Sequence, residues 1–181
     1  MAHKNCDPRR YWSKKFNFPI KNGVKLYVKV RRYSWVTEYP KYGFMLGGIP
    51  TKNYLKKNKH RISGIINLCD ESVDDTDIKT LHLPTVDSRE PTKKQIRRGV
   101  KFFRKLRKNE PNKFVYIHCR VGVSRSAEMC VACLCSEFAK GPGRAFRILQ
   151  KKRPQIKSKC YTRPNITAFC NEYMKNNMAC Q

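Results

Sequence analysis

The residues with the clearest potential for chemistry lie in one stretch, where Cys119 is followed by five residues and then Arg125. The apolar and β-branched run at residues 114–117 predicts a buried strand. The good helix formers that follow Ser126 predict a helix. A strand–loop–helix junction aims backbone N–H groups and a helix N-terminus at one point, which is an anion site. The sequence therefore places a thiol and a guanidinium at a predicted anion site.

The chemistry follows from these residue types. A free thiol has a pKa of about 8.5, and a helix N-terminus with nearby cations lowers it to roughly 3.5–7.5. We therefore expect Cys119 to be a thiolate that attacks phosphorus, and Arg125 to hold two phosphate oxygens with its planar fork. Gly122 would let the loop bend with its amides inward, where a side chain would crowd the phosphate. Ser126 would donate a hydrogen bond to the sulfur, and His118 would orient the loop from beneath.

These residues form the pattern His-Cys-x5-Arg-Ser, which resembles the signature of the cysteine-dependent phosphatases. The sequence Gly-Val-Ser-Arg-Ser-Ala, which begins within this pattern, is most similar to that of the dual-specificity branch. The resemblance implies a phosphocysteine intermediate, no metal and no cofactor. It also implies that the loop binds the phosphoryl oxygens, through Arg120, Val121, Gly122, Val123, Ser124 and Arg125. The alternative is a buried cysteine at a strand end beside a surface arginine.

A departing alkoxide or phenolate needs a proton, which a carboxylic acid on a mobile loop can supply. Asp87 follows a predicted strand in a proline-bounded loop and lies 32 residues before Cys119. That order and spacing match the general acid of dual-specificity phosphatases. Asp70 and Glu90 are weaker candidates, since one follows a different strand and the other adjoins a helix start. The alternative for Asp87 is a turn-forming or capping carboxylate.

Strands and helices alternate around these residues. We expect strands within 33–50, at 62–68 as a central strand, at 80–84 and at 113–118. Helices are expected at 51–59 and 92–109, each capped by a threonine, from Ser126 to about 140, and at 144–153 and 165–175, with a break at 141–143. This order predicts an α/β fold with the reactive loop at a strand's carboxyl end. The resemblance implies a single-domain protein-tyrosine-phosphatase-like fold, with a central mixed sheet of about four to five strands and helices on both faces.

The chain divides into three predicted parts. Residues 1–32 form a basic N-terminal arm with a short strand at 24–30, and a mitochondrial presequence is an alternative for its beginning. Residues 33–175 form the phosphatase-like catalytic domain, and residues 176–181 form a tail. Within the domain, residues 33–36, 44–50, 83–87 and 153–156 are similar to the mitochondrial protein-tyrosine-phosphatase-like lipid phosphatases.

The charge of the chain limits its partners. Lys and Arg number 40 against 13 Asp and Glu, which gives a formal net charge of +27. Such a field favours anionic partners. We expect a phosphorylated protein substrate, with an anionic lipid as a second option, and we do not expect nucleic acid. The alternative is a solvated, lysine-rich surface. No apolar run approaches the ~18 residues of a transmembrane segment.

Nine cysteines are spread without the spacing of a disulfide framework, so we expect a reducing compartment. The cytoplasm is the expected location, while the nucleus and the mitochondrion stay open. Cys130, Cys133 and Cys135 share a predicted helix and are interpreted as buried thiols, not metal ligands. The acidic run at residues 70–77 is interpreted as a solvated loop, with metal binding as the alternative.

Together these features predict a phosphomonoester hydrolase that acts through a phosphocysteine on phosphotyrosine, phosphoserine and phosphothreonine in proteins. A phosphoinositide or phosphatidylglycerophosphate phosphatase is the enzymatic alternative, and an RNA 5′-phosphatase is a more distant one. A non-catalytic phosphate-binding module is the alternative of another class. The presence of Cys119, Arg125 and Asp87 together favours an enzyme, since a binding module would not need all three.

Overall fold

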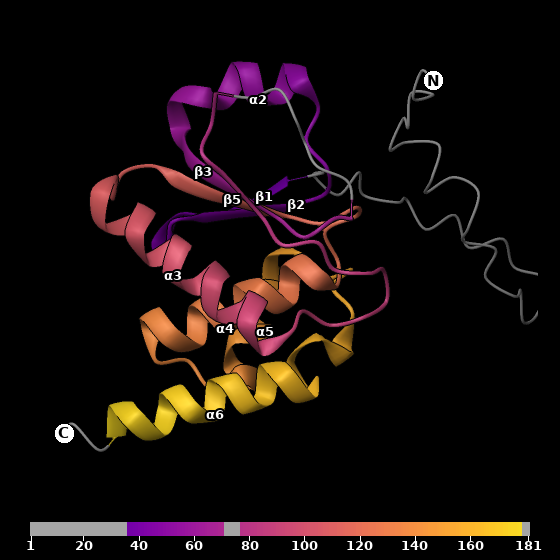
Figure 1. Cartoon of the computed structure of the whole chain (residues 1–181), viewed down its shortest axis with the longest axis vertical. Coiled ribbons are helices and arrows are strands. Elements are labelled where there is room, and N and C mark those ends of the chain that lie inside the picture. The colour runs from indigo at the N-terminus through magenta and orange to yellow at the C-terminus, as the bar shows by residue number, and fades with distance from the viewer. Residues whose placement is uncertain (1–35, 71–76, 179–181) are drawn as a thin grey trace, which may run out of the picture. The chain divides into compact units, whose positions relative to one another are not determined.

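Figure 1 shows the computed structural model of the chain, which describes residues 36–70 and 77–178. The predicted N-terminal arm at 1–32 with its strand at 24–30, most of the acidic run, and the last residues of the predicted tail lie outside the described residues. The division into arm, domain and tail therefore stays a prediction. Among the helices that are described, none combines the length and the apolar character needed to cross a membrane.

The predicted mixed sheet is confirmed, and within residues 36–70 and 77–178 it has five strands. They are β1 (Val36–Tyr39), β2 (Phe44–Gly47), β3 (Ile62–Asn67), β4 (Thr80–His82) and β5 (Phe114–His118), in the order β1-β2-β5-β3-β4. β1 pairs antiparallel with β2, and the other three pairs are parallel. The centre of the sheet is β5, the strand that leads to the reactive loop, while the expected central strand at 62–68 is its neighbour β3.

The part of the chain that the structure describes has five α-helices: α2 (Lys52–Asn58), α3 (Lys93–Asn109), α4 (Arg125–Phe138), α5 (Pro142–Lys152) and α6 (Pro164–Met178). Both predicted threonine caps are present: Thr51 accepts a hydrogen bond from the Tyr54 amide, and Thr92 forms a capping box with Gln95. α5 begins inside the predicted break, because the fixed φ of Pro142 suits the first turn of a helix. α6 continues three residues past its expected end.

The helices cover both faces of the sheet, as predicted. α3, α4, α5 and α6 pack on one face around the larger apolar core, and α2 covers the other face over a smaller cluster (Figure 1). α4 is enclosed on all sides, since every residue from Arg125 to Cys135 is buried. The place of this helix between the sheet and three other helices leaves no solvent-exposed side over those residues.

The cysteines of α4 depart in part from the prediction. Cys130 and Cys133 are buried free thiols, as expected. Cys135 is not a free thiol, because it forms a disulfide with Cys170 of α6. The sequence separation of 35 residues gave no indication of this pair; the packing of α4 against α6 brings the two together.

Candidate active site

The loop between β5 and α4 is shaped by hydrogen bonds on its outer side. Four consecutive carbonyl oxygens accept from outside the loop, each from a different N–H group. Ile49 N donates to Arg120 O (3.3 Å), Arg153 Nη2 to Val121 O (3.2 Å), Arg153 Nε to Gly122 O (2.8 Å), and Lys157 N to Val123 O (3.0 Å). In a trans peptide the C=O and the following N–H point in opposite directions. The amides of residues 121–124 therefore face the inside of the loop.

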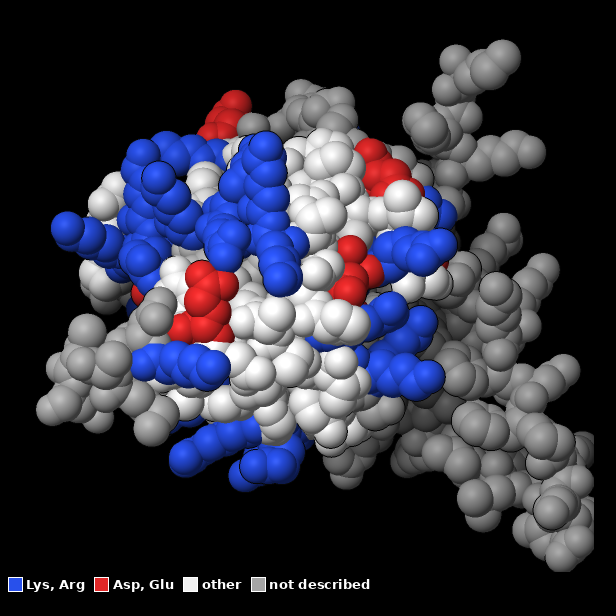
Figure 2. Space-filling model, turned by 60° about the horizontal axis from the view of Figure 1, so that its bottom comes forward, with Lys and Arg blue, Asp and Glu red and all other residues white. Residues whose placement is uncertain are grey.

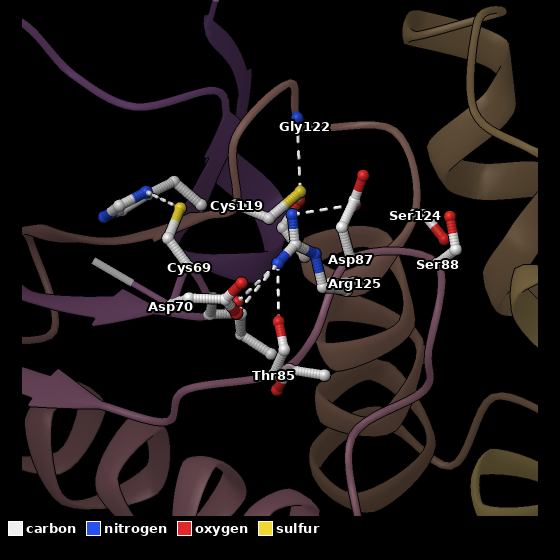
Figure 3. Close-up of polar contacts among 12 residues, drawn as sticks. Cys69, Asp70, Thr85, Asp87, Ser88, Cys119, Gly122, Ser124 and Arg125 are labelled. Atoms are coloured by element: carbon white, nitrogen blue, oxygen red, sulfur yellow. Dashed lines mark hydrogen bonds and ion pairs between the residues drawn. The ribbon is translucent and has the colours of Figure 1, made fainter. Parts of the chain in front are cut away.

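One of the inward amides contacts the sulfur of Cys119. The Gly122 amide donates to Cys119 Sγ at 3.3 Å (Figure 3). Cys119 follows the last residue of β5, and the helix that begins at Arg125 points its N-terminus at the same place. The loop thus forms a concave row of N–H donors around a thiol, which is the anion-binding arrangement that the sequence predicted.

Gly122 has a φ of 77°, in the left-handed region that glycine adopts without strain. The close packing behind the loop gives a further reason for the glycine. A Cβ at this position would lie 2.4 Å from Gly47 C and 2.8 Å from Arg153 Nη2. A side chain is therefore excluded by the end of β2 and by the arginine behind the loop, and crowding of the phosphate stays a prediction.

Cys119 is 3% exposed and its pKa is lowered. Burial alone would raise the pKa of the thiol, but hydrogen bonds from Ser126 and Gly122 and the charge of Arg125 stabilise the thiolate more strongly. Ser126 Oγ lies 3.2 Å from the sulfur. The geometry thus has the features expected of an activated nucleophile.

Arg125 is only 2% exposed, and carbonyls orient its guanidinium. Nη1 donates to Thr85 O at 2.6 Å and to Leu68 O at 3.3 Å, the backbone that follows β4 and β3. Nη2 forms an ion pair of 2.9 Å with Asp87, and Asp70 lies 3.7 Å from Nη1 (Figure 3). Because parallel strands end at the same edge of the sheet, residues that follow two strands, β3 and β4, meet at this one arginine after β5.

The candidate acids are placed differently. Asp87 lies on the loop between β4 and α3 with its side chain 74% exposed, so it can move while remaining next to Arg125. Asp70 is the nearer of the two weaker candidates. Glu90 accepts a hydrogen bond from the Asn165 amide at the start of α6. This hydrogen bond anchors the loop between β4 and α3 to α6.

His118 is completely buried, and burial lowers its pKa to about 3, so the imidazole is neutral. Its Nδ1 lies 4.0 Å from Cys69 Sγ. The low pKa agrees with the expectation that His118 orients the loop and does not titrate in the reaction. The structure describes no cluster of three or more His, Cys, Asp or Glu side chains that could hold a metal ion among residues 36–70 and 77–178.

Sequence reasoning missed a second set of residues behind the loop. Glu128 is 0% exposed and accepts from Ser124 Oγ at 3.2 Å. Arg163 Nε lies 3.5 Å from the same carboxylate, and Arg163 Nη2 donates to Ser88 O, next to Asp87. Burial raises the pKa of Glu128 to about 7, and Glu90 adds to that effect, while Arg163, Ser124 and Arg125 oppose it. The two halves of the site are thereby joined through one buried carboxylate.

These contacts had no clear signal in the sequence. Arg153 was noted as part of a resemblance, but its guanidinium reaches the loop from the end of α5, about thirty residues later in the chain. Glu128 lies in a run of helix formers, where a carboxylate is ordinarily solvated. Only the burial of α4 on all sides gives it a role.

Comparison with known proteins places the chain among phosphatases. Residues 45–169 match the dual specificity phosphatase catalytic domain. The chain is 29% identical to the mouse (Mus musculus) "Phosphatidylglycerophosphatase and protein-tyrosine phosphatase 1", with 72% of each chain covered. The human (Homo sapiens) protein of the same name is 28% identical over 72% of this chain and 69% of its own.

Solved structures agree with this placement. PTPMT1 in complex with PI(5)P superposes with a TM-score of 0.64 at 26% identity, covering 80% of this chain and 97% of that one. DUSP15 superposes with a TM-score of 0.64 at 21% identity, covering 80% and 95%. The second likeness concerns the fold alone and confirms the expected protein-tyrosine-phosphatase-like architecture.

Proposed function

Because the chain belongs to the family of dual specificity phosphatase catalytic domains, we propose that it hydrolyses phosphomonoesters through a phosphocysteine. Its proposed substrates are proteins that carry phosphotyrosine, phosphoserine or phosphothreonine. The observation that carries the proposal is the loop itself. Its amides face inward around a thiol whose pKa is lowered, and a buried guanidinium lies beside them.

The proposed reaction has two steps. In the first, Cys119 Sγ donates an electron pair to phosphorus, the bond to the leaving oxygen breaks, and Asp87 transfers a proton to that oxygen. In the second, water attacks the phosphocysteine and gives a proton to Asp87. The sulfur then leaves as a thiolate stabilised by Ser126 and Gly122. Arg125 and the loop amides hold the phosphoryl oxygens in both steps.

The ion pair between Asp87 and Arg125 fits this sequence. Phosphate oxygens would replace the carboxylate on Nη2, because the guanidinium fork binds a phosphate through two N–H groups. The carboxylate would then be free to face the leaving group. Thr85 O and Leu68 O would continue to hold Nη1, so the arginine keeps its orientation during the exchange.

A second candidate is a lipid phosphatase, and the relatives favour it. The printed name of the similar mouse and human proteins includes phosphatidylglycerophosphatase, and the superposed PTPMT1 structure contains PI(5)P. A non-catalytic phosphate-binding module is the candidate of another class. Location in a reducing compartment, with the cytoplasm favoured, stays a prediction.

The test is phosphate release from a panel of substrates, with Cys119→Ser as the blank. The panel holds phosphotyrosine and phosphoserine peptides, phosphoinositides, phosphatidylglycerophosphate and 5′-triphosphate RNA. Release from phosphopeptides with the highest kcat/KM supports the proposal. Release from lipids alone would replace it by the second candidate. Phosphopeptide binding without release from any substrate would identify a binding module.

A further inference from the structure

α3 is basic along its whole exposed length. Nine of its 17 residues are Lys or Arg, and none is Asp or Glu. The apolar side of the helix is buried against the core through Ile96, Val100, Phe103 and Leu106, so the charged side must face solvent. In Figure 2, Lys and Arg side chains project side by side from one region of the surface, with few Asp or Glu among them.

Some of these cations have intramolecular partners. Arg97 pairs with Glu172 and Arg104 with Glu137, and Arg107 donates to backbone carbonyls after the helix. A second set is exposed, and its side chains make no hydrogen bond or ion pair with the described residues of the chain. This set, which we name the α3 stripe, consists of Lys94, Arg98, Lys101, Lys105 and Lys108.

The α3 stripe is a straight row. Its members are separated by four, three, four and three residues, which places them on one line along an α-helix. At 1.5 Å per residue, the row from Lys94 to Lys108 is about 21 Å long. Five like charges in such a row raise the local positive potential, and they suit a partner that carries regularly spaced negative charges.

A membrane fits the α3 stripe poorly. α3 joins the parallel strands β4 and β5, so it runs from the end of the sheet at which the loop with Asp87 lies back to the opposite end. A bilayer that met the phosphate loop would touch only its first turn, and Lys108 would be about 20 Å away, beyond a Debye length of about 8 Å. The stripe also has no apolar side chain to insert, since Val86 is the only exposed large apolar residue described.

A protein partner fits it no better. Stable protein interfaces depend on buried aromatic or apolar anchors, with charges at the rim. The α3 stripe has no such anchor. A polyphosphate chain needs none, because neutralised phosphates and released counterions supply the affinity. Gln95, the one amide side chain in α3 before its last residue, is engaged with Thr92 and the Pro84 carbonyl, so its amide is not available to read bases.

We propose that the α3 stripe binds the phosphate backbone of nucleic acid without reading sequence. The inference is independent of the proposed function. None of the five side chains belongs to the loop between β5 and α4 or to the loop between β4 and α3 that carries Asp87. It departs from the expectation, stated from the sequence, that nucleic acid is not a partner. A flexible polyanion can follow α3 along its whole length, from the loop that carries Asp87 to the opposite end of the sheet. A flat bilayer that meets the phosphate-binding loop cannot.

The experiment measures fluorescence anisotropy of a labelled 20-nucleotide RNA of mixed sequence with the full-length protein in increasing salt. The test variant is Lys101→Glu with Lys105→Glu. The matched control is Lys56→Glu with Lys57→Glu, two exposed lysines of α2 on the other face of the sheet. Both variants carry the same net charge, so overall electrostatics is held constant. Circular dichroism and thermal unfolding report that each variant is folded.

We expect five stripe contacts to give a slope of log K against log[salt] of about −3.5 or steeper, since each single-strand phosphate contact contributes about −0.7. The test variant should bind RNA at least about tenfold more weakly at 0.1 M salt, with a slope shallower by about 1.4. The control should change affinity less than about threefold. Equal losses in the two variants would overturn the proposal, because the charge would then act diffusely.

Two competitor arms distinguish the class of partner. Vesicles of phosphatidylcholine with phosphatidylglycerol represent the membrane, and polyglutamate represents an acidic protein segment. RNA should bind more tightly than either at equal charge concentration, and only RNA binding should depend on the α3 stripe. Stripe-dependent binding to vesicles or polyglutamate that equals or exceeds RNA binding would overturn the assignment to nucleic acid.

Discussion

Among single residues, Cys119 carries the proposed chemistry because its surroundings stabilise a negative charge more than burial opposes it. Cys119→Ser replaces the thiol by a hydroxyl that stays protonated at neutral pH, while the amides of residues 121–124 still face inward. Turnover of an aryl phosphate should fall about a thousandfold or more. Binding of inorganic phosphate, measured by protection against thermal unfolding, should persist.

The matched control for that variant is Cys133→Ala, a buried thiol of α4 in the core. It removes a sulfur without touching the loop, so kcat/KM should stay within about threefold of wild type. If Cys119→Ser kept a tenth of the activity, another nucleophile would have to be sought.

Asp87 has a separate role that leaving groups can reveal. An activated aryl phosphate departs without protonation, whereas an alkyl phosphate needs a proton on its oxygen. Asp87→Asn should therefore slow hydrolysis of an alkyl phosphate at least about tenfold more than that of the aryl phosphate. The measurement is kcat for both substrates in wild type and variant. Equal losses on the two would direct attention to Asp70, which lies 3.7 Å from Arg125.

Glu128 adds a pH dependence of stability. Its pKa is raised from 4.5 to about 7 by folding, chiefly through burial. Between these values the unfolded chain has lost the proton that the folded protein still binds, so the free energy of unfolding falls as pH rises through 7. Glu128→Gln keeps the neutral shape and removes this loss. The free energy of unfolding of the variant, relative to that of wild type, should therefore rise between pH 4 and pH 8. The expected rise is on the order of 3 kcal/mol.

Urea unfolding of both proteins at pH 4 and pH 8 measures that difference. Glu172→Gln, which removes an exposed carboxylate of α6, controls for the change in net charge. A difference between wild type and Glu128→Gln that is the same at both pH values would show that the buried carboxylate does not titrate as the structure indicates.

At the scale of elements, the reactive loop depends on a residue at the end of another helix. Arg153 holds two of the four outward carbonyls and also donates to Thr37 of β1. Arg153→Lys has a single ammonium that cannot reach Val121 O and Gly122 O in the same geometry. The inward amides should become less ordered, and kcat/KM for an aryl phosphate should fall about tenfold to a hundredfold.

The control for Arg153→Lys is Lys151→Met, an exposed residue of the same helix, which should leave kcat/KM unchanged. Near-wild-type turnover in Arg153→Lys, with folding verified by circular dichroism, would mean that the backbone donors Ile49 N and Lys157 N hold the loop by themselves.

The sequence predicted the type of many helices and strands but not how they pack. The strand–loop–helix around Cys119 and both threonine caps depend on neighbouring residues, so local patterns predicted them. The position of β5 at the sheet centre, the burial of α4 on every side, and the Cys135–Cys170 disulfide depend on packing between distant segments. Periodicity carries no information about which surfaces meet, and these features were therefore missed or misplaced.

At the scale of the whole molecule, fold and family were predictable because one short motif specifies both a geometry and a chemistry. The sequence also brought together Cys119, Arg125 and Asp87, whose roles remain proposals. The contacts that support the loop from behind were not predictable from the sequence. Glu128 and Arg163 acquire their contacts only when α4 and α6 are packed, and a buried carboxylate has no sequence pattern that separates it from an exposed one.

The net charge of +27 leads to the last prediction. A field of this sign should attract a substrate with many negative charges, and the attraction should weaken with salt as the Debye length falls from about 10 Å at 0.1 M to about 3 Å at 1 M. An aryl phosphate interacts mainly with the loop and Arg125, which are largely buried and therefore screened less. We expect kcat/KM for an acidic phosphotyrosine peptide to fall at least about tenfold between 0.05 and 0.5 M sodium chloride. For the aryl phosphate, and for a phosphopeptide of equal length without acidic residues, the fall should be within about threefold. Parallel salt slopes for the three substrates would mean that the charge is a solvated surface with no part in substrate capture.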